Sequence, residues 1–224
     1  MMPSLYRLLP WLSPPIRPCD WRTPLADMHW LVVDCESSGL NPRRDKLIEL
    51  AAVPIEGRII HLGRAMEHVL RQDSTSSIAN ILIHGISGRR QLDGDAPELV
   101  MQTFAAKLDG VVVAGFHAAF DRELCKRALH RYTLKRLTGR WLDLADLAPA
   151  ICPEHALTCH TLDDWLAALN IRVAHRHTAA GDALATAQLM QTLIARVPPE
   201  SSAKDLFKLA AAHRELALQR SVLR

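Results

Sequence analysis

The stretch LVVDCE, residues 31–36, sets an apolar run directly against two carboxylates. Its apolar residues predict a buried strand. Because side chains two apart on a strand point to the same face, Asp34 and Glu36 project together from the end of this strand, while Val33 and Cys35 point the opposite way. Two acids at one site repel each other and resist ionising together unless a cation neutralises them. The stretch therefore predicts a strand that delivers a pair of acids to one site.

Acidic residues also follow two later segments. Asp121 stands after the predicted strand VVVAG, at the mouth of a helix, and His177 and Asp182 stand where a polar loop enters the longest predicted helix. A strand that simply ends in solvated acids explains one such segment, but it does not explain three. Mg²⁺ and Mn²⁺ prefer carboxylate oxygens as ligands. The three segments together therefore favour a shared site for divalent cations.

The composition indicates one folded unit. The chain has 224 residues, 49% of them hydrophobic and 23% charged, which suffices to bury one core. The net charge of +3 does not by itself indicate a polyanionic ligand. The five cysteines form no CxxC pair, and we see no secretory signal and no apolar run of membrane-spanning length. We therefore expect reduced thiols, a cytoplasmic location and no membrane contact.

Apolar runs and turn residues predict an α/β fold with a mixed sheet. Three β-rich runs come first, as a meander, and shorter strands and helices then alternate. The predicted strands cover residues 30–36, 46–55, 58–70 and 111–115. The predicted helices cover residues 97–108, 118–132, 143–151, 161–169 and 178–197. We divide the chain into a Pro- and Trp-rich N-terminal arm (1–29), a single domain (30–197) and a C-terminal helix (198–224).

Four stretches together resemble a known family. They are VVDCESSGLNPRRDKLIELAAV (32–53), IHGIS (83–87), AGFHAAFDREL (114–124) and RHTAAGDALATAQLM (176–190). In this order they resemble the DEDDh group of 3′-to-5′ exonucleases, which the epsilon proofreading subunit of bacterial DNA polymerase III typifies. The resemblance implies an RNase H-like fold, with a mixed central sheet flanked by helices.

The resemblance also implies roles for single residues. It assigns Asp34 and Glu36 to the first motif, Asp121 to the second, and His177 with Asp182 to the third. It implies that the four carboxylates hold two divalent ions, Mg²⁺ or Mn²⁺, and that His177 is the general base for the attacking water. The implied reaction releases nucleoside 5′-monophosphates one at a time from the 3′ end of single-stranded or frayed DNA. A five-residue offset does not stack on a helix, so we expect the histidine on the loop before the helix.

Two motifs depart from the pattern of the family. Ser37 and Ser38 stand where the family usually has threonines, which keeps the hydroxyl groups. Phe116 and His117 stand where the second motif usually begins with His-Asn. The second change alters how this part of the site is held and leaves the predicted metal ligands in place.

A basic run, RELCKRALHRYTLKRLTGR (122–140), follows the second motif. Lysine and arginine grip phosphodiester backbones irrespective of base sequence, although they also form ordinary solvated helix faces. We predict substrate contacts from four residues of the motifs and of this run, namely Ser37, His117, Arg122 and Lys126.

The expected partners are 3′ ends of single-stranded nucleic acid, with DNA favoured over RNA, and a DNA polymerase or sliding clamp. The tripeptide Asp205-Leu206-Phe207 resembles the end of clamp-binding peptides, but it also suits a packing helix. One rival interpretation is a nuclease of the same fold that trims RNA or degrades oligoribonucleotides. Another is a non-catalytic nucleic-acid-binding module associated with a polymerase, which the complete set of acids disfavours.

Overall fold

The computed structural model describes residues 20–174 and 176–222. Residues 1–19, which make up most of the predicted N-terminal arm, lie outside the described residues, as do His175, Leu223 and Arg224. All five residues that the resemblance assigns to the site are described.

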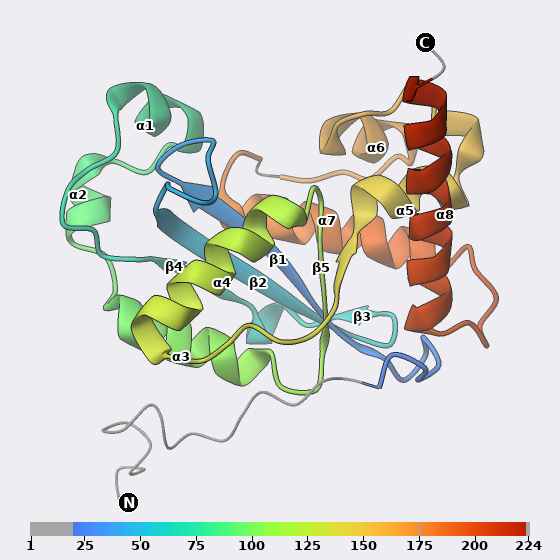
Figure 1. Cartoon of the computed structure of the whole chain (residues 1–224), viewed down its shortest axis with the longest axis horizontal. Helices are drawn as coiled ribbons and strands as arrows, with labels where there is room; N and C mark the ends of the chain where they lie inside the picture. Colours follow the sequence, from blue (N-terminus) through green and yellow to red (C-terminus); the bar gives the residue numbers. More distant parts are fainter. Residues whose placement is uncertain (1–19, 175, 223–224) are drawn as a thin grey trace, which may run out of the picture.

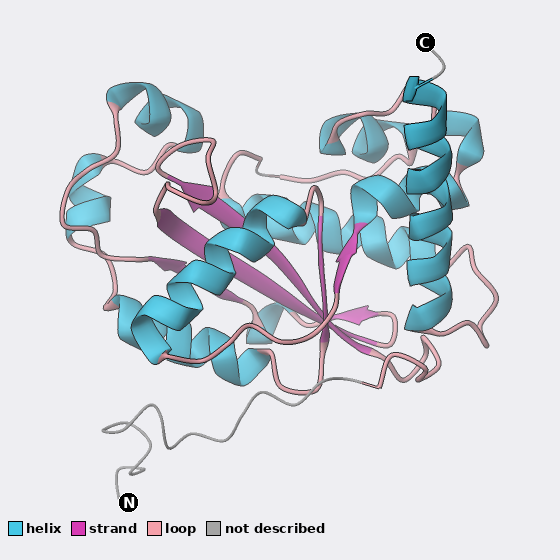
Figure 2. Ribbon diagram, in the orientation of Figure 1, coloured by secondary structure: helices cyan, strands magenta, loops and turns pink. Residues whose placement is uncertain are grey.

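Six strands form one mixed sheet in the described part of the chain (Figures 1 and 2). The strand order is β3-β2-β1-β5-β6, and β4 pairs with β2. Strand β1 runs antiparallel to β2 and parallel to β5, and β5 runs parallel to β6. The strands are β1 (His29–Ser37), β2 (Leu47–Glu56), β3 (Ile59–Ile60), β4 (Met66–Val69), β5 (Val112–Gly115) and β6 (Trp141–Asp143).

The helices of the described residues cover the sheet and its ends. They are α1 (Ile78–His84), α2 (Gly88–Leu92), α3 (Pro97–Lys107), α4 (Ala119–Thr133), α5 (Leu144–Ile151), α6 (Leu162–Ala168), α7 (Ala179–Ile194) and α8 (Ala203–Val222). Side-chain caps define several starts: Asp143 caps α5, Thr161 caps α6 and Thr178 caps α7.

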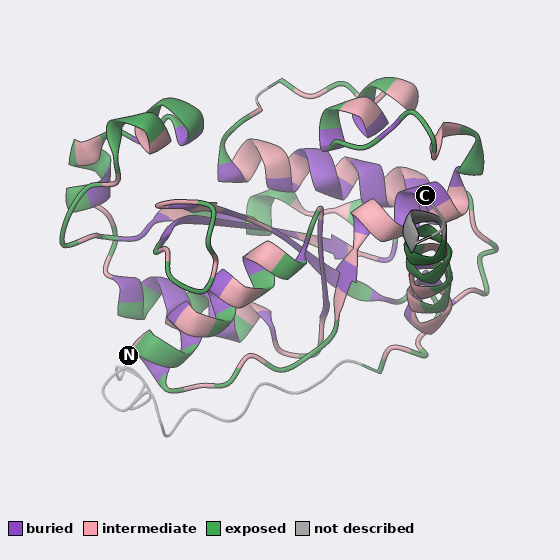
Figure 3. Ribbon diagram, turned by 45° about the horizontal axis from the view of Figure 1, so that its top comes forward, coloured by how far each residue is buried: buried purple, intermediate pink, exposed green. Residues whose placement is uncertain are grey.

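The sheet lies between two helical layers. In Figure 3, α7 lies on one side of the sheet, and α3 and α4 lie on the other. Trp30 and Val32 of β1 join the core cluster that contains α7, whereas Leu31 and Val33 join the cluster that contains α3 and α4. By this alternation Asp34 leaves the strand on the α7 side. Helices cover both faces, which explains why β1 reads as a continuous apolar run.

The prediction of one continuous strand over residues 58–70 was wrong. This segment forms β3, a short 3₁₀ turn (Leu62–Arg64) and β4. Ile60 pairs with Ile55 and Met66 pairs with Ala52, so both short strands use the same edge of β2. The segment that joins β3 to β4 has more residues than the part of β2 beside it. This segment therefore bulges away from the edge of β2.

The sequence analysis also missed three short elements, α1, α2 and β6. Each spans seven residues or fewer, which is too short for a helical or alternating pattern to stand out. Helix α1 in addition exposes three large apolar residues, Ile78, Leu82 and Ile83, so its hydrophobic pattern does not mark a buried face.

Helix α8 packs against α5 through residues at its first turns. Ala203 and Leu206 are fully buried, whereas Leu209 and Leu216, further along the helix, are exposed. Phe207 packs edge-on against Trp21. Leu206 and Phe207 of this tripeptide therefore take part in packing α8 in this structure.

The described cysteines, Cys35, Cys125, Cys152 and Cys159, are buried free thiols, as expected. Among the described residues, no helix combines the length and the apolar character that a membrane span requires.

Candidate active site

The first part of the site is the end of β1. Asp34 and Glu36 are partly buried there, and the following residue, Ser37, donates its hydroxyl to the Gly39 carbonyl at 2.5 Å. Burial raises the pKa of Asp34 well above its usual range, and the neighbouring charges of Asp121, Asp182 and Glu36 raise it further. Arg176 partly opposes this effect.

The second part is Asp121, in the first turn of α4. Asp121 is only 5% exposed, because it lies where α4 packs against the sheet. Burial raises the pKa of Asp121 to about 8, although the Cys35 thiol and backbone N–H groups stabilise the charged form. An acid so deeply buried favours either a proton or a bound cation.

The third part is the entrance to α7. Asp182 lies in the first turn of this helix and accepts a hydrogen bond from the His177 backbone N–H at 3.1 Å. The Arg176 guanidinium pairs with the same carboxylate oxygen and with Asp163 at 2.7 Å. Burial nevertheless raises the pKa of Asp182. Any ion that binds Asp182 competes with this guanidinium.

His177 lies on the loop before α7, as its spacing predicted. Its ring is exposed, and its backbone adopts a left-handed conformation with φ +62°. This conformation costs a non-glycine residue about 1–3 kcal/mol and persists where the surrounding contacts enforce it. Contacts with the rest of the protein, and not the backbone preference of histidine, therefore hold this turn in its conformation.

The electrostatics show that the three motifs share one site. The pKa of Glu36 is raised to about 7, first by burial and then by the charges of Asp182 and Glu49. Asp34 is in turn affected by the charges of Asp121, Asp182 and Glu36, so acids from β1, α4 and α7 influence one another's ionisation. Among the described residues, no three His, Cys, Asp or Glu side chains stand close enough to enclose one ion as they are placed. The donor set nevertheless fits hard divalent cations, because buried, mutually repelling carboxylates need positive charge.

The sequence analysis missed three residues that shape this site: Glu49, Asp143 and Arg176. Glu49 is 1% exposed on β2, directly opposite Glu36. Asp143 accepts hydrogen bonds from the His117 N–H at 2.9 Å and from a backbone N–H of α5. A signal existed for Glu49, since LIELAAV places a charged residue inside an otherwise apolar strand.

The residues predicted to contact substrate lie around these acids. His117 is exposed and, like His177, left-handed, with φ +57°. Arg122 and Lys126 are exposed on α4, where Lys126 pairs with Glu123 at 3.1 Å. The Ser37 hydroxyl donates to the Gly39 carbonyl, within the turn that follows β1. These four assignments stay predictions.

Comparisons with known proteins identify the family. Residues 31–190 match the RNase T exonuclease family. The chain belongs to this family. It is 28% identical over 170 residues to a PolC-type DNA polymerase III of Oceanobacillus iheyensis, a match covering 75% of this chain and 12% of that protein. It is 29% identical over 176 residues to a DNA polymerase III subunit epsilon-like protein of Rhodobacter capsulatus, covering 77% of this chain and 24% of that one. The chain thus spans less than a quarter of the length of these relatives.

Solved structures confirm the RNase H-like fold. The zinc-bound complex of E. coli ExoI with single-stranded DNA matches with a TM-score of 0.67 and 19% identity, over 78% of this exonuclease chain and 42% of that chain. Exonuclease I from Methylocaldum szegediense matches with a TM-score of 0.66 and 21% identity, over 77% and 42%.

Proposed function

We propose that this chain is a metal-dependent 3′-to-5′ exonuclease that hydrolyses the terminal phosphodiester bond of single-stranded or frayed DNA. The observation that carries the proposal is that acids from three separate segments act on one another. Burial raises the pKa of Asp34, Glu36, Asp121 and Asp182, and the charges of the other three acids raise the pKa of Asp34 further. A purely structural role does not explain such a cluster, because each buried carboxylate costs stability when it is ionised.

The proposed metal ligands are Asp34, Glu36, Asp121 and Asp182. Two bound divalent ions, Mg²⁺ or Mn²⁺, would activate water and stabilise charge on the attacking and leaving oxygens. The protein supplies acids on three rigid elements, which fixes their relative positions. The Arg176 guanidinium supplies positive charge to Asp182 in this structure.

His177 is the proposed general base. Its ring is exposed at the entrance to α7, while its backbone N–H is bonded to Asp182. The backbone of His177 is therefore tied to a proposed ligand, and its exposed ring would accept a proton from the attacking water. The water oxygen would bond to the terminal phosphorus as the bond from phosphorus to the 3′ oxygen breaks. The shortened strand then ends in a 3′ hydroxyl, and a nucleoside 5′-monophosphate is released.

DNA is the proposed substrate, and exonuclease I structures with single-stranded DNA support this choice. Basic residues of α4 beside the second motif, among them Arg122 and Lys126, suit a phosphodiester backbone. The polymerase III relatives support a role in proofreading or repair with a polymerase partner.

A labelled-strand assay tests this proposal. DNA and RNA strands of equal sequence, labelled at the 5′ end, are incubated with Mg²⁺ or Mn²⁺ and with a chelator. On DNA we expect a ladder of progressively shorter labelled strands, which forms only when metal is present. The released product should be mononucleotides. A ladder on RNA alone would contradict the proposal and favour a ribonuclease of the same fold. No ladder on either strand would refute the proposal.

A further inference from the structure

Glu49 lies beside the proposed site without belonging to any of its acidic motifs. Its carboxylate is buried between β2 and the start of α7, with 2% of the side chain exposed. It stands opposite Glu36 in the register of β1 and β2. A carboxylate in such surroundings needs defined partners, because burial raises its pKa and disfavours its charged form.

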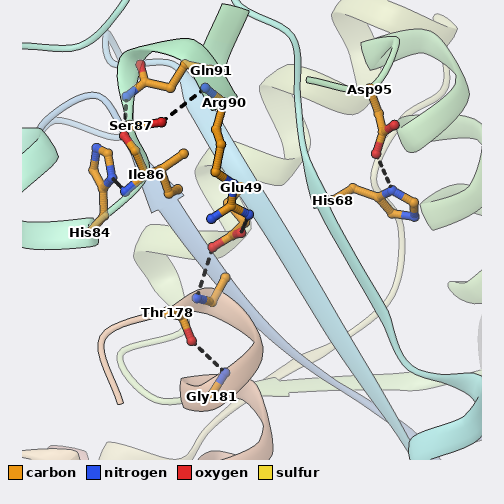
Figure 4. A network of polar contacts seen from close by, with 11 residues as sticks. Glu49, His68, His84, Ile86, Ser87, Arg90, Gln91, Asp95, Thr178 and Gly181 are labelled. Carbon is orange, nitrogen blue, oxygen red and sulfur yellow. Dashed lines mark hydrogen bonds and ion pairs between the residues drawn. The ribbon is translucent and has the colours of Figure 1, made fainter. Parts of the chain in front are cut away.

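Both oxygens of this carboxylate have a partner. Oε2 accepts a hydrogen bond from the backbone N–H of Ala179 at 3.2 Å. Oε1 lies 3.7 Å from the Arg90 guanidinium of α2. Figure 4 shows Glu49 between Arg90 and the start of α7, where Thr178 and Gly181 lie. With both oxygens engaged, Glu49 is not arranged as a further metal ligand.

The bond to Ala179 fixes a strained turn. Ala179 is the first residue of α7, and its buried N–H is one of the donors that a helix start leaves without an intrahelical acceptor. Thr178 satisfies the Gly181 N–H at 3.1 Å but does not reach Ala179. Two residues before Ala179 stands His177, in its left-handed conformation. Glu49 therefore ties this end of the turn to the same sheet that carries Asp34 and Glu36.

Arg90 is itself held in place. Its neighbour Gln91 is fully buried and donates to the Ile86 carbonyl at 2.9 Å and to the Ser76 hydroxyl at 3.0 Å. These bonds anchor the end of α2 that carries Arg90, whose side chain is 58% exposed and lies beside Glu49 Oε1.

We propose that Glu49 is a positioning residue for the exonuclease reaction: through the Ala179 N–H it sets the turn that carries His177 and Asp182 against the acids of β1. This inference rests on the proposed function for its kinetic consequence, but its structural content stands without it.

Two conservative substitutions of Glu49 separate this role from a need for charge. Glu49→Gln keeps the reach and an acceptor oxygen but loses the charge, whereas Glu49→Asp keeps the charge but is one methylene too short. We expect Glu49→Gln to stay within about threefold of the parent in kcat, and Glu49→Asp to lose about 10- to 100-fold in kcat while KM changes less than about threefold. The matched controls are Glu67→Gln and Glu67→Asp, at an exposed acid that lines one surface pocket together with Glu49.

Amide hydrogen exchange at Ala179 provides a readout that does not depend on activity. We expect protection in the parent and in Glu49→Gln, and faster exchange in Glu49→Asp. Equal kcat for both variants, a greater loss in Glu49→Gln, or unchanged exchange in Glu49→Asp would overturn the inference. A parent enzyme without exonuclease activity but with this exchange pattern would refute the proposed function and leave the positioning contact intact.

Discussion

The raised pKa values of the site acids predict an unusual dependence of stability on pH. Glu36, at about 7, and Asp121, at about 8, keep their protons in the folded state at pH values where the unfolded chain has lost them. The folded state then binds more protons, so the free energy of unfolding falls as pH rises. We expect the metal-free protein to melt at a progressively lower temperature between about pH 5 and about pH 9.

Asp121→Asn provides the control for this prediction. The amide mimics the protonated acid, so its melting temperature should fall less steeply over the same range, and it should exceed that of the parent at the alkaline end. Saturating Mn²⁺ should raise the melting temperature of the parent but not that of the variant. Parallel slopes for parent and variant in chelator would contradict the assignment of the titration to this acid.

The exposed ring of His177 leads to a second prediction. General-base catalysis contributes about 10²- to 10⁴-fold, so His177→Ala should lower kcat within that range. Metal-induced stabilisation should persist, because no proposed ligand is changed. His175 precedes Asp182 by seven residues instead of the five that the family pattern has, so His175→Ala should have a much smaller effect. Measurement of kcat against pH for both variants, in saturating Mn²⁺, checks this, and a greater loss in His175→Ala would move the base to that residue.

The acids of the site were predictable, but the groups that hold them were not. Asp34, Glu36, Asp121 and Asp182 follow apolar or helical patterns at fixed spacings, which short motifs encode. Arg176, in contrast, acts through a contact with Asp163, a residue of another helix. Only the folded structure brings such residues together, so no local pattern marks them.

Arg127, a basic residue of α4, makes structural contacts with the loop that follows β1. Its Nη1 donates to the carbonyls of Pro42 and Asp45, both at 2.7 Å. The guanidinium thus fastens the loop that follows β1 to α4. We expect Arg127→Ala to lower the free energy of unfolding by about 1–3 kcal/mol, since charged groups form the stronger hydrogen bonds. Urea denaturation measures this change.

Arg131, one turn further along α4 and exposed, supplies the matched control. Arg131→Ala should change stability by less than about 0.5 kcal/mol, the usual range for surface positions. Similar losses in both variants would show that the loop contact of Arg127 contributes nothing particular to stability.

Long elements were easier to predict than short ones for a physical reason. Strand β1 and helices α4 and α7 were predicted within a few residues, because each contains enough residues for its period to appear. Strand β6 has three residues and owes its place to pairing with β5, which is not a property of its own sequence. The break between β3 and β4 likewise follows from how both fit the edge of β2.

The attachment of α8 concerns the molecule as a whole. Ser202 and Asp205 form a cap in which the Ser202 hydroxyl donates to the carboxylate at 2.7 Å, and Leu206 is fully buried beside it. Leu206→Ala should therefore destabilise the protein by about 2–5 kcal/mol. Leu216→Ala, at an exposed position of the same helix, should have little effect. A calorimetric melt of both variants decides whether α8 belongs to the same cooperative unit as the exonuclease domain.

The central claim is that acids from three motifs act together as one site for divalent cations, and calorimetric titration with Mn²⁺ measures this most directly. We expect the parent to bind Mn²⁺ and the variants Asp34→Asn and Asp182→Asn to bind it at least about tenfold more weakly, because each removes a charged ligand from the same cluster. Glu67→Gln, outside the cluster, should bind as the parent does. Absence of Mn²⁺ binding by the parent, or unchanged affinity in both Asn variants, would contradict the account.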